Sequence, residues 1–575
     1  MRRKLFLLSL VLLPAALLIH LGIMVFIDDE AIRSLVAQEM LWSGNYVAPT
    51  MHGDAYLNKP PLWNWVLALS FTLHGEASEW AARLPTVISL LGFAGTTYFF
   101  SRKYFPRYLA GLHALTVITC GRMLFWDSML ALIDVTFSWV VYAQIMVLYH
   151  YASGRTATRR SEAPVTGDIG PVSSAAIPNW WLAFGISYAL TAVGFMLKGL
   201  PAIVFQGLTV FAIVGWTRSW KQLFRPAHLL SGLACVGLLA IYYWQYSQYV
   251  DVGQVAQRLF VESGKRTAVA HGLLESVRHI AAFPFEMSYH FLPWTFLLVY
   301  LLQRGSWQRL RKNDFAAFCL VAFLVNIPVY WFSPNVYPRY LLMLFPLLFG
   351  SLLFLHGEHK VAKTRSYRGL RFLFLGLMTL CAAVIPFAPL FPETEVVSYA
   401  WLKSLTLGGA AGAVVWLAWR SDRNLLLLFA VFLLLLRIGF NFFVLPPRAA
   451  GDERGIAVKE TAYTAMENHT QDSVAIFGYT LIEPATGYYL TQARGHVVPR
   501  KWKDFDRETF YIVSPLQYPD IKMEATDSLF LRHLSRRYPD MDTRYPVGTL
   551  VNPPKAWING GEELRDGMGT GVPIE

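Results

Sequence analysis

Three adjacent carboxylates, Asp28, Asp29 and Glu30, stand directly after the first long apolar run of the sequence, which ends at Ile27. A lysine, Lys59, followed by two prolines, lies further along the same polar loop. Ionisable groups at the edge of a membrane segment are unfavourable there, so they are candidates for a functional site. One acid would be an ordinary solvated helix cap. Three acids together, with a proline-restrained lysine in the same loop, favour chemistry.

Further charged residues are expected at the same edge of the apolar segments. The acids are Asp127 and Asp134, which flank the turn between the third and fourth segments. The bases at segment rims or in loops on that side are Arg122, Lys198, Arg266 and Arg339. A single rim lysine such as Lys198 could simply reach for the lipid interface. Several bases around an acid cluster instead indicate a pocket for an anionic headgroup, because Lys and Arg hold phosphate oxygens with charge-assisted hydrogen bonds.

These residue types suit a displacement at a carbon that carries a phosphate. A carboxylate facing the pocket could act as a general base and take the proton of an acceptor hydroxyl as its oxygen attacks that carbon. The departing phosphate would already be stabilised by cations, so no nucleotide-binding domain is needed. The sequence contains no P-loop and no dinucleotide-binding fingerprint. The residue types alone identify neither the sugar nor the acceptor.

The elements that would position these residues are apolar helices. Of the 575 residues, 55% are hydrophobic and only 15% are charged, whereas soluble domains carry about 25% charged residues. Apolar runs long enough to cross the hydrocarbon core as a helix recur, and we predict about thirteen of them. The expected segments cover residues 5–27, 80–100, 108–126, 130–150, 180–197, 200–217, 227–249, 284–303, 314–333, 340–356, 370–390, 401–419 and 424–446.

The basic residues are distributed with a clear sidedness. Alternate loops carry Lys and Arg clusters, for example around Arg102, Arg159, Lys221 and Lys360. The positive-inside rule makes that side cytoplasmic, so the net charge of +12 requires no nucleic-acid partner. An odd number of spans places the N-terminus in the cytoplasm and the residues after Val444 outside. We therefore predict a multi-pass protein of the bacterial inner membrane that lies in the lipid bilayer.

Residues 1–447 are expected to form the transmembrane domain. Its first external loop, residues 28–79, contains two amphipathic stretches, Ala31–Trp42 and Leu62–Leu73. Neither is long enough to span a bilayer, and their Trp and Phe content suits helices that lie in the interface plane. On the cytoplasmic side, the insert 152–178 is rich in Ser, Thr, Ala, Gly and Pro and is expected to be a linker.

Residues 448–575 have a polar composition and are predicted to form a small extracytoplasmic α/β domain. The apolar runs that follow Ser473 and Thr509 are typical of buried strands. Apolar periodicity predicts helices at Ile456–Asn468 and Ser528–Arg537. The fold class is therefore a polytopic α-helical membrane protein with this second, smaller domain.

Several of these residues fall in a familiar order. The chain reads Asp29-Glu30, Glu39-Met40, Ser43-Gly44-Asn45-Tyr46, Lys59-Pro60-Pro61-Leu62 and Ala82-Arg83-Leu84-Pro85. This order and spacing resembles the protein mannosyltransferase and aminoarabinose transferase (ArnT-like) superfamily, membrane glycosyltransferases of the GT-C type. The resemblance continues more thinly through Lys198-Gly199, Arg266 and Tyr337-Pro338-Arg339-Tyr340. The residues beyond about 450 match only in position, as an external domain after the helices.

The resemblance implies a GT-C fold and an inverting glycosyltransferase that works on the periplasmic face. The sugar would move from a polyprenyl-phosphate donor to a hydroxyl or phosphate of a lipid, glycan or protein acceptor. Asp29 would be the catalytic acidic residue with Glu30 beside it, and Asp134 fits the place of a second one better than Asp127. The donor phosphate would bind Lys59 and Arg266, with Lys198 and Arg339 as weaker candidates. Weaker substrate-binding candidates are Asn58, Arg122, Asp127, Tyr337 and Tyr340.

The sequence also departs from the aminoarabinose transferases at two positions. Asn58 stands where they have a Glu that helps to bind zinc, and Ile32-Arg33 stands where they have Arg-Tyr. Both departures count against zinc and against lipid A as the acceptor. No cofactor is required by the residues, although a divalent cation could bind through Asp29 and Asp134.

Two other classes of protein compete with an enzyme. A lipid-linked sugar transporter or flippase would show inverted repeats and charges near the midplane of the membrane, whereas these charges crowd one face. A non-enzymatic membrane scaffold for the external domain would not need the cluster of acids and bases. Changing Asp29 to Asn would leave the activity of such a scaffold intact.

Overall fold

The computed structural model describes the chain apart from residues 28, 158–172, 176, 265–272, 533–543 and 555–575. Its contacts divide the chain into two compact units. Unit 1 comprises Met1–His20, Thr86–Ile241 and Ser263–Pro447, and unit 2 comprises Leu21–Pro85, Tyr242–Glu262 and Arg448–Glu575. The first external loop therefore groups with the C-terminal residues, whereas the sequence-based boundary at 447 groups it with the transmembrane domain.

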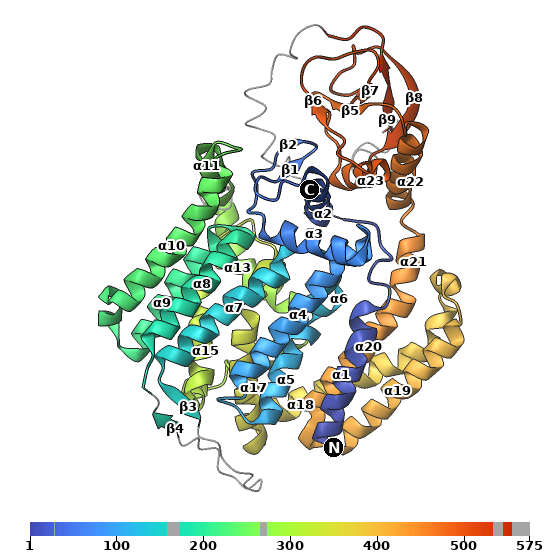
Figure 1. Ribbon diagram of the computed structural model, residues 1–575. Helices are drawn as coiled ribbons and strands as arrows, with labels where there is room; N and C mark the ends of the chain where they lie inside the picture. Colours follow the sequence, from blue (N-terminus) through green and yellow to red (C-terminus); the bar gives the residue numbers. More distant parts are fainter. Residues whose placement is uncertain (28, 158–172, 176, 265–272, 533–543, 555–575) are drawn as a thin grey trace. The chain divides into compact units, whose positions relative to one another are not determined.

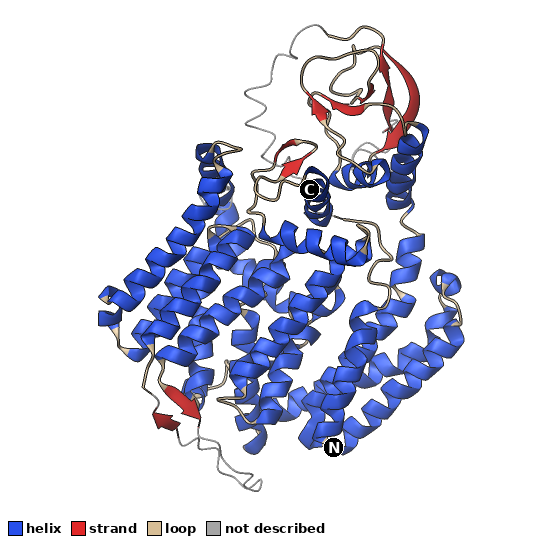
Figure 2. Ribbon diagram, in the orientation of Figure 1, coloured by secondary structure: helices blue, strands red, loops and turns tan. Residues whose placement is uncertain are grey.

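Unit 1 is built of helices with one short antiparallel hairpin of β3 (Arg155–Ala157) and β4 (Ser173–Ala175) (Figure 1, Figure 2). Its longer helices are α1 (Arg2–Leu18), α4 (Glu79–Ser101, which begins in unit 2), α5 (Arg107–Thr119), α7 (Ile133–Ala152), α8 (Trp180–Lys198), α9 (Pro201–Thr217), α10 (Pro226–Tyr246), α13 (Leu273–His290), α15 (Asp314–Asn326), α17 (Phe345–Val361), α18 (Arg365–Val384), α19 (Ala400–Arg420) and α20 (Leu425–Phe443). Short elements between them include α6 (Gly121–Phe125), η1 (Asp127–Met129), η3 (Trp294–Tyr300) and η4 (Pro338–Leu341). Among these, α7 packs against both α8 and α9, and α1 packs against α20.

Among the described residues, seven helices are long and apolar enough to cross a membrane, or eight if the bent pair Arg107–Thr119 and Gly121–Met129 is one span. Three other expected segments, α1, α9 and α17, have 17 residues each. The chain is thus a multi-pass membrane protein, and the figure of about thirteen spans stays a prediction. The expected continuous helix at 284–303 is wrong. There α13 ends at His290 and η3 starts at Trp294, because Pro293 has no N–H to continue a helix.

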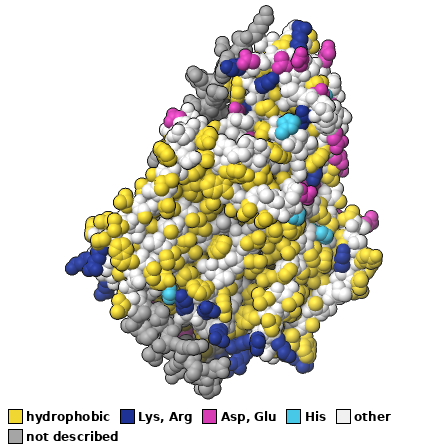
Figure 3. Space-filling view, in the orientation of Figure 1, with side chains coloured by type: hydrophobic (Ala, Val, Ile, Leu, Met, Phe, Trp, Pro, Cys, Tyr) yellow, Lys and Arg dark blue, Asp and Glu magenta, His cyan; other side chains and the backbone are white. Residues whose placement is uncertain are grey.

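The exposed side chains of unit 1 are those of a surface that faces lipid. On α10 the exposed residues include Leu229, Leu233, Val236 and Ile241. On α19, Trp401 is exposed near one end and Trp416 and Trp419 near the other, as in the aromatic belts of membrane helices. Figure 3 shows a broad apolar surface on this unit, with Lys and Arg gathered along its lower edge. Unit 1 therefore has one basic end, and the side of the membrane that this end faces stays a prediction.

Unit 2 combines helices with a five-stranded sheet. Its elements are α2 (Asp29–Ser43), the hairpin of β1 (Thr50–Met51) and β2 (Asp54–Ala55), α3 (Leu62–His74), α11 (Val252–Gly264), α22 (Glu453–Asn468), β5 (Val474–Phe477), α23 (Pro484–Arg494), β6 (Arg500–Lys501), β7 (Phe510–Ile512), β8 (Met523–Phe530) and β9 (Arg544–Leu550). The strand order is β6-β5-β7-β9-β8. Strand β5 is parallel to β6 and β7, and β9 is antiparallel to β7 and β8.

Most elements expected in unit 2 are present, with one error. The helices at 31–42, 62–73 and 456–468 and the strands after Ser473 and Thr509 are confirmed. The expected helix Ser528–Arg537 begins too early, because residues 528–530 belong to strand β8, which pairs with β9; Arg532 is helical, and residues 533–537 lie outside the described part. Helix α2 packs against α3 and α23 and is buried over most of its length. A position in the interface plane therefore suits α3, where Leu69 and Leu73 are exposed, better than α2.

Candidate active site

A buried ion pair joins two neighbouring helices of unit 1. Asp134 lies in the first turn of α7, and Lys198 is the last residue of α8, which packs along α7. The ammonium group of Lys198 donates a hydrogen bond to Oδ1 of Asp134, and both side chains are about 5% exposed. Helix α8 ends here because Gly199 takes a φ of 81°, a left-handed conformation that a residue with a Cβ avoids. This turn holds the lysine at the helix end.

A second cation lies on the other side of Asp134. Arg339, on the short helix η4, places its Nε 3.5 Å from Oδ2 of Asp134. Aromatic rings cover both cations: Nζ of Lys198 lies 3.9 Å from the ring centre of Tyr340, and the guanidinium carbon of Arg339 lies 4.5 Å from that of Tyr337. We call Asp134, Lys198, Arg339, Tyr337 and Tyr340 the unit 1 cluster. The structure thus brings five sequence-predicted site residues together.

The unit 1 cluster brings two basic groups to one buried carboxylate. Two cations, Lys198 and Arg339, face one carboxylate, Asp134, and all three side chains are less than a tenth exposed. Arginine and lysine around an anion are the usual means of holding a phosphate. The cluster can therefore hold the phosphate of a ligand.

Next to this cluster, Arg122 and Asp127 form another pair. Nε of Arg122 donates to Oδ2 of Asp127 at 3.0 Å. The other oxygen, Oδ1 of Asp127, is buried and has no hydrogen-bond partner among the described residues. Asp134 and Arg339 are close enough to interact electrostatically with Asp127. A buried carboxylate oxygen without a partner is a strong acceptor for a hydroxyl or amino group of a ligand.

In unit 2, the acids at the start of α2 have unequal surroundings. Glu30 is fully buried, and its carboxylate accepts from Arg83 at 2.7 and 3.1 Å and from the N–H of Ile27 at 2.9 Å. Arg83 also donates to the carbonyl oxygens of Leu21, Met24 and Val25. All five N–H groups of that guanidinium are therefore used. Glu30 and Arg83 fix the chain that leads into α2.

Asp29, the first residue of α2, is only partly buried. A helix N-terminus favours a negative charge because its first N–H groups are unpaired. The other predicted residues of this loop, Asn58 and Lys59, are partly buried and precede α3 in the same unit. Arg266 lies outside the described residues. The proposed grouping of Asp29, Lys59 and Arg266 thus stays a prediction.

Sequence reasoning missed the residues that hold the first loop in shape. Arg83 was recognised as part of the Ala-Arg-Leu-Pro motif, but no structural role was predicted for it, although an arginine beside a membrane segment needs an acidic partner. Glu39 was treated likewise; it accepts from the hydroxyl of Thr50 at 2.7 Å and from the N–H groups of His52 and Gly53. Burial raises the pKa of Glu39 in spite of these bonds. Its place in the motif was the only signal for this role.

A resident metal has no recognisable ligand set in the part of the chain that the structure describes. No group of three His, Cys, Asp or Glu side chains there could hold a metal ion. The two expected cation ligands, Asp29 and Asp134, belong to different units. Binding of a divalent cation by them therefore stays a prediction.

The chain is similar to proteins of known class. No family model matches it. An undecaprenyl phosphate-alpha-4-amino-4-deoxy-L-arabinose arabinosyl transferase of Pseudomonas aeruginosa (strain LESB58) is 22% identical over 402 residues, 68% of this chain and 67% of that protein. The protein of the same name from Erwinia tasmaniensis is 24% identical over 414 residues, 68% of this chain and 66% of that protein.

The crystal structure of ArnT from Cupriavidus metallidurans bound to undecaprenyl phosphate has the same fold. Its TM-score is 0.65 at 17% identity, and the match covers 96% of this chain and 99% of that one. The resemblance to the ArnT-like GT-C superfamily is thereby confirmed. The unit 1 cluster and the Glu30–Arg83 pair are therefore features of an ArnT-like chain, and neither the transporter nor the scaffold is favoured by these likenesses.

Proposed function

We propose that this chain is an inverting glycosyltransferase that moves a sugar from a polyprenyl-phosphate donor to an acceptor hydroxyl or phosphate. The observation that carries the proposal is the unit 1 cluster, in which two buried cations face one carboxylate. An ArnT-like fold, one solved example of which is bound to undecaprenyl phosphate, supports a lipid phosphate as the ligand of these cations.

In this proposal the cations of the unit 1 cluster bind the donor phosphate. Arg339 presents a planar guanidinium that can donate two parallel hydrogen bonds, and Lys198 adds a point charge. Asp134 holds both cations in place while the phosphate is absent. As the bond from the sugar carbon to the phosphate oxygen breaks, the growing negative charge on the phosphate is stabilised by groups already oriented for it. Lys59 and Arg266 are proposed as further phosphate ligands.

The acceptor is activated by a carboxylate. Asp29 takes the proton of the acceptor hydroxyl, and the hydroxyl oxygen forms a bond to the sugar carbon as the phosphate leaves. One displacement of this kind inverts the configuration at that carbon. Glu30, bound by Arg83, positions the turn that carries Asp29.

Asp127 supplies a contact to the sugar itself. Its buried Oδ1 has no partner among the described residues, and a sugar hydroxyl or ammonium group would satisfy it. An ammonium group would gain most, since it pairs with a carboxylate as a charge-assisted hydrogen bond. Substrates of the relatives named above carry an amino group on the sugar, so an amino sugar is the proposed class.

The proposed location is the bacterial inner membrane, with the reaction on the periplasmic face. The basic loops of unit 1 favour the cytoplasm by the positive-inside rule. Asp134 and Lys198 lie at the opposite ends of their helices from such loops, since α7 begins at Ile133 and is followed by the insert after Ala152. The donor headgroup would therefore be used on the periplasmic face of the membrane.

The proposal is tested by deleting the gene and analysing membrane lipids by mass spectrometry. A polyprenyl-phosphate sugar should accumulate, and its mass identifies the sugar. Returning the parent gene to the deletion strain should remove the accumulated lipid, whereas the Asp29→Asn gene should not. Asp520→Asn, an exposed acid changed in the same way, is the control and should remove the lipid like the parent. Clearance by Asp29→Asn at the parental rate would show the catalytic assignment to be wrong. If no lipid-linked sugar accumulates in the deletion strain, although the strain with the intact gene makes the full-length protein, the proposed function is overturned.

A further inference from the structure

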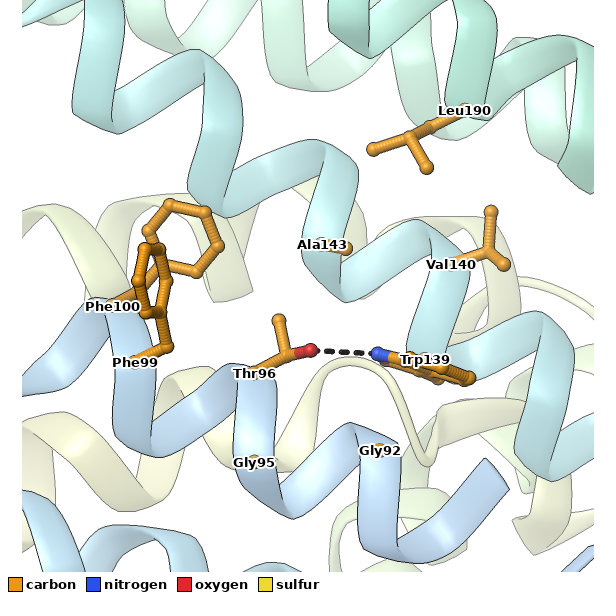
Figure 4. Close-up of a pocket in the computed structure, with 9 residues that line it drawn as sticks. All are labelled: Gly92, Gly95, Thr96, Phe99, Phe100, Trp139, Val140, Ala143 and Leu190. Atoms are coloured by element: carbon orange, nitrogen blue, oxygen red, sulfur yellow. Dashed lines mark hydrogen bonds between the residues drawn. The ribbon is translucent and has the colours of Figure 1, made fainter. Parts of the chain in front are cut away.

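A cavity of about 520 Å³ lies in unit 1, beside helices α4, α7 and α8 (Figure 4). Its wall includes Gly92, Gly95, Thr96 and Phe99 from α4, Trp139 from α7 and Leu190 from α8. Sites that bind small molecules commonly measure roughly 300–1,000 Å³. Phe99 is 45% exposed, so this wall belongs to the apolar surface of the helices and is accessible from lipid. The cavity is large enough for part of a lipid.

The lining is suited to a hydrocarbon chain. Its polar side chains satisfy each other, because Nε1 of Trp139 donates to Oγ1 of Thr96 at 2.7 Å (Figure 4). The missing side chain of Gly95 leaves space open in the cavity, and that of Gly92 makes room for the Trp139 ring. A Cβ on Gly92 would come within 2.6 Å of the Trp139 ring, which lies directly on the helix backbone, and a Cβ on Gly95 would meet nothing within 4 Å. The cavity therefore offers no unsatisfied polar group to a ligand.

One end of the cavity is positively charged. Arg102 and Lys103 directly follow α4 and lie against its Phe99: the ring centre is 5.3 Å from the guanidinium carbon of Arg102 and 4.5 Å from Nζ of Lys103. Lys103 is fixed by a 2.8 Å hydrogen bond to Nε2 of His150, whose Nδ1 pairs with the hydroxyl of Tyr104 at 2.8 Å. The apolar wall thus leads to two cations, one of them held in place by the protein.

We propose that this cavity binds an acyl chain of an anionic glycerophospholipid whose phosphate lies against Arg102 and Lys103. The charge of the rim matches the headgroup, and the apolar wall matches the chain. Anionic lipids collect at basic loops next to membrane helices, and Arg102 is exposed to receive one. A chain lying along α4 from Phe99 to Gly92 would follow about 10 Å of helix, at roughly 1.5 Å per residue.

This site is separate from the proposed donor site. Asp134 is in the first turn of α7 and His150, which holds Lys103, is in its last turn. Sixteen residues along a helix correspond to about 24 Å. A phosphate bound at Lys103 is therefore too far from Asp134 to be the leaving group of the transfer. The lipid would instead hold α4 against α7 and α8 at the basic end of unit 1.

Native mass spectrometry of the purified full-length protein tests this site. The protein is incubated with phosphatidylglycerol or phosphatidylcholine, and retained lipid molecules are counted. We expect the parent to retain phosphatidylglycerol in preference. Gly95→Leu, which fills the empty space, and Arg102→Ala with Lys103→Ala, which removes the charge, should each lower retention by about tenfold. Arg107→Ala removes an exposed cation at the same end and should retain the lipid like the parent.

Each outcome decides the proposal. Equal retention of the two lipids by the parent, or parental retention by the variants, would overturn it. If Gly95→Leu does not fold, the charge variant and Gly95→Ala supply the comparison, with Gly95→Ala expected to lie between parent and charge variant. A parallel incubation with undecaprenyl phosphate shows which class of lipid supplies the bound hydrocarbon chain. Displacement of phosphatidylglycerol by that lipid at equal concentration would overturn the assignment to a glycerophospholipid, and the transfer assay described above is unaffected by either result.

Discussion

Two buried ion pairs begin helices in this chain, one in each unit, and they differ in how their charges are matched. Glu30, in the first turn of α2, faces Arg83, whose five N–H groups are all used by that carboxylate and by backbone carbonyls. Asp134, in the first turn of α7, faces Lys198 and Arg339, two cations for one acid. The first joins one acid to one base, and the second joins one acid to two bases.

The comparison separates structural from functional buried charge. A fully bonded pair holds the chain in one conformation, and removal of one partner leaves a buried charge that destabilises the fold. Two cations held side by side by one carboxylate are suited to bind an anionic ligand, so in the proposed function the residues of the unit 1 cluster affect ligand and reaction more than folding. The four predictions below test this difference, from the largest expected effect to the smallest.

Asp134→Asn should give the largest effect, on the reaction. The amide cannot hold two cations as the carboxylate does, so we expect turnover to fall by about 10³-fold, within the range for a misplaced catalytic constellation. The Michaelis constant for the donor should not rise, because Lys198 and Arg339 keep their charges. Turnover and thermal unfolding are measured together on purified protein. A large loss of stability with normal turnover per folded molecule would put Asp134 in the same class as Glu30.

Arg83→Met should give the largest effect on stability. It leaves the fully buried Glu30 without its partner, which we expect to lower the free energy of unfolding by about 3–5 kcal/mol. Adding Glu30→Gln to Arg83→Met should restore part of that loss, because the unpaired charge is removed. Denaturant unfolding in detergent measures both variants. Turnover per folded molecule should fall much less than in Asp134→Asn, because the pair only positions the turn that carries Asp29; a fall as large as that of Asp134→Asn in the stable double variant would instead support a direct catalytic task for Glu30.

Lys198→Ala should weaken donor binding. The loss of one charged contact to the phosphate predicts a rise of about 10- to 100-fold in the donor's Michaelis constant. Lys459→Ala is a matched control, because Lys459 also pairs with an acid, Glu79 at 2.9 Å, but is 40% exposed. That variant should bind donor like the parent. Equal donor binding by both lysine variants would mean that the unit 1 cluster does not hold the phosphate.

The sequence predicted different features in the two units. Hydropathy located the helices of unit 1, and their order placed Asp134 and Lys198 at helix ends, but only packing of α7 on α8 shows that the two side chains meet. Long-range contacts of this kind leave no periodic signal. The segment at 284–303 failed because apolar composition does not distinguish a continuous helix from one interrupted at Pro293.

In unit 2, local patterns identified helices and short buried strands, whereas the end of strand β8, residues 528–530, was predicted as the start of a helix. Its residues Met523–Phe530 alternate little in burial, and pairing with β9 overrides their local preference. The grouping of the first loop with the C-terminal residues was equally invisible, because it depends on the packing of α2 on α23. Arg83 was recognised as part of a motif, but its role could not be predicted because its partner, Glu30, lies far from it in the sequence.

Protonation of His52 should give the smallest effect, which is a loss of stability of unit 2 at low pH. Its side chain is buried, Nδ1 has no hydrogen-bond partner among the described residues, and burial together with the charge of Arg500 lowers its pKa from 6.5 to about 3. Between these two pH values the unfolded chain binds a proton that the folded chain does not, so the free energy of unfolding falls as the pH falls. At pH 5 the loss is about 2 kcal/mol, at about 1.36 kcal/mol per pH unit.

His52→Asn removes the titrating ring and keeps a residue that tolerates the left-handed backbone at this position, where φ is 56°. Its free energy of unfolding should therefore fall less steeply between pH 6.5 and pH 4 than that of the parent. Glu39 acts in the opposite sense, because its raised pKa favours folding at low pH and loses that contribution as the pH rises. The difference between parent and variant cancels this shared term and isolates the histidine. Identical slopes would mean that the buried polar groups of unit 2 are solvated in the native protein, which would remove the contrast with the unit 1 cluster.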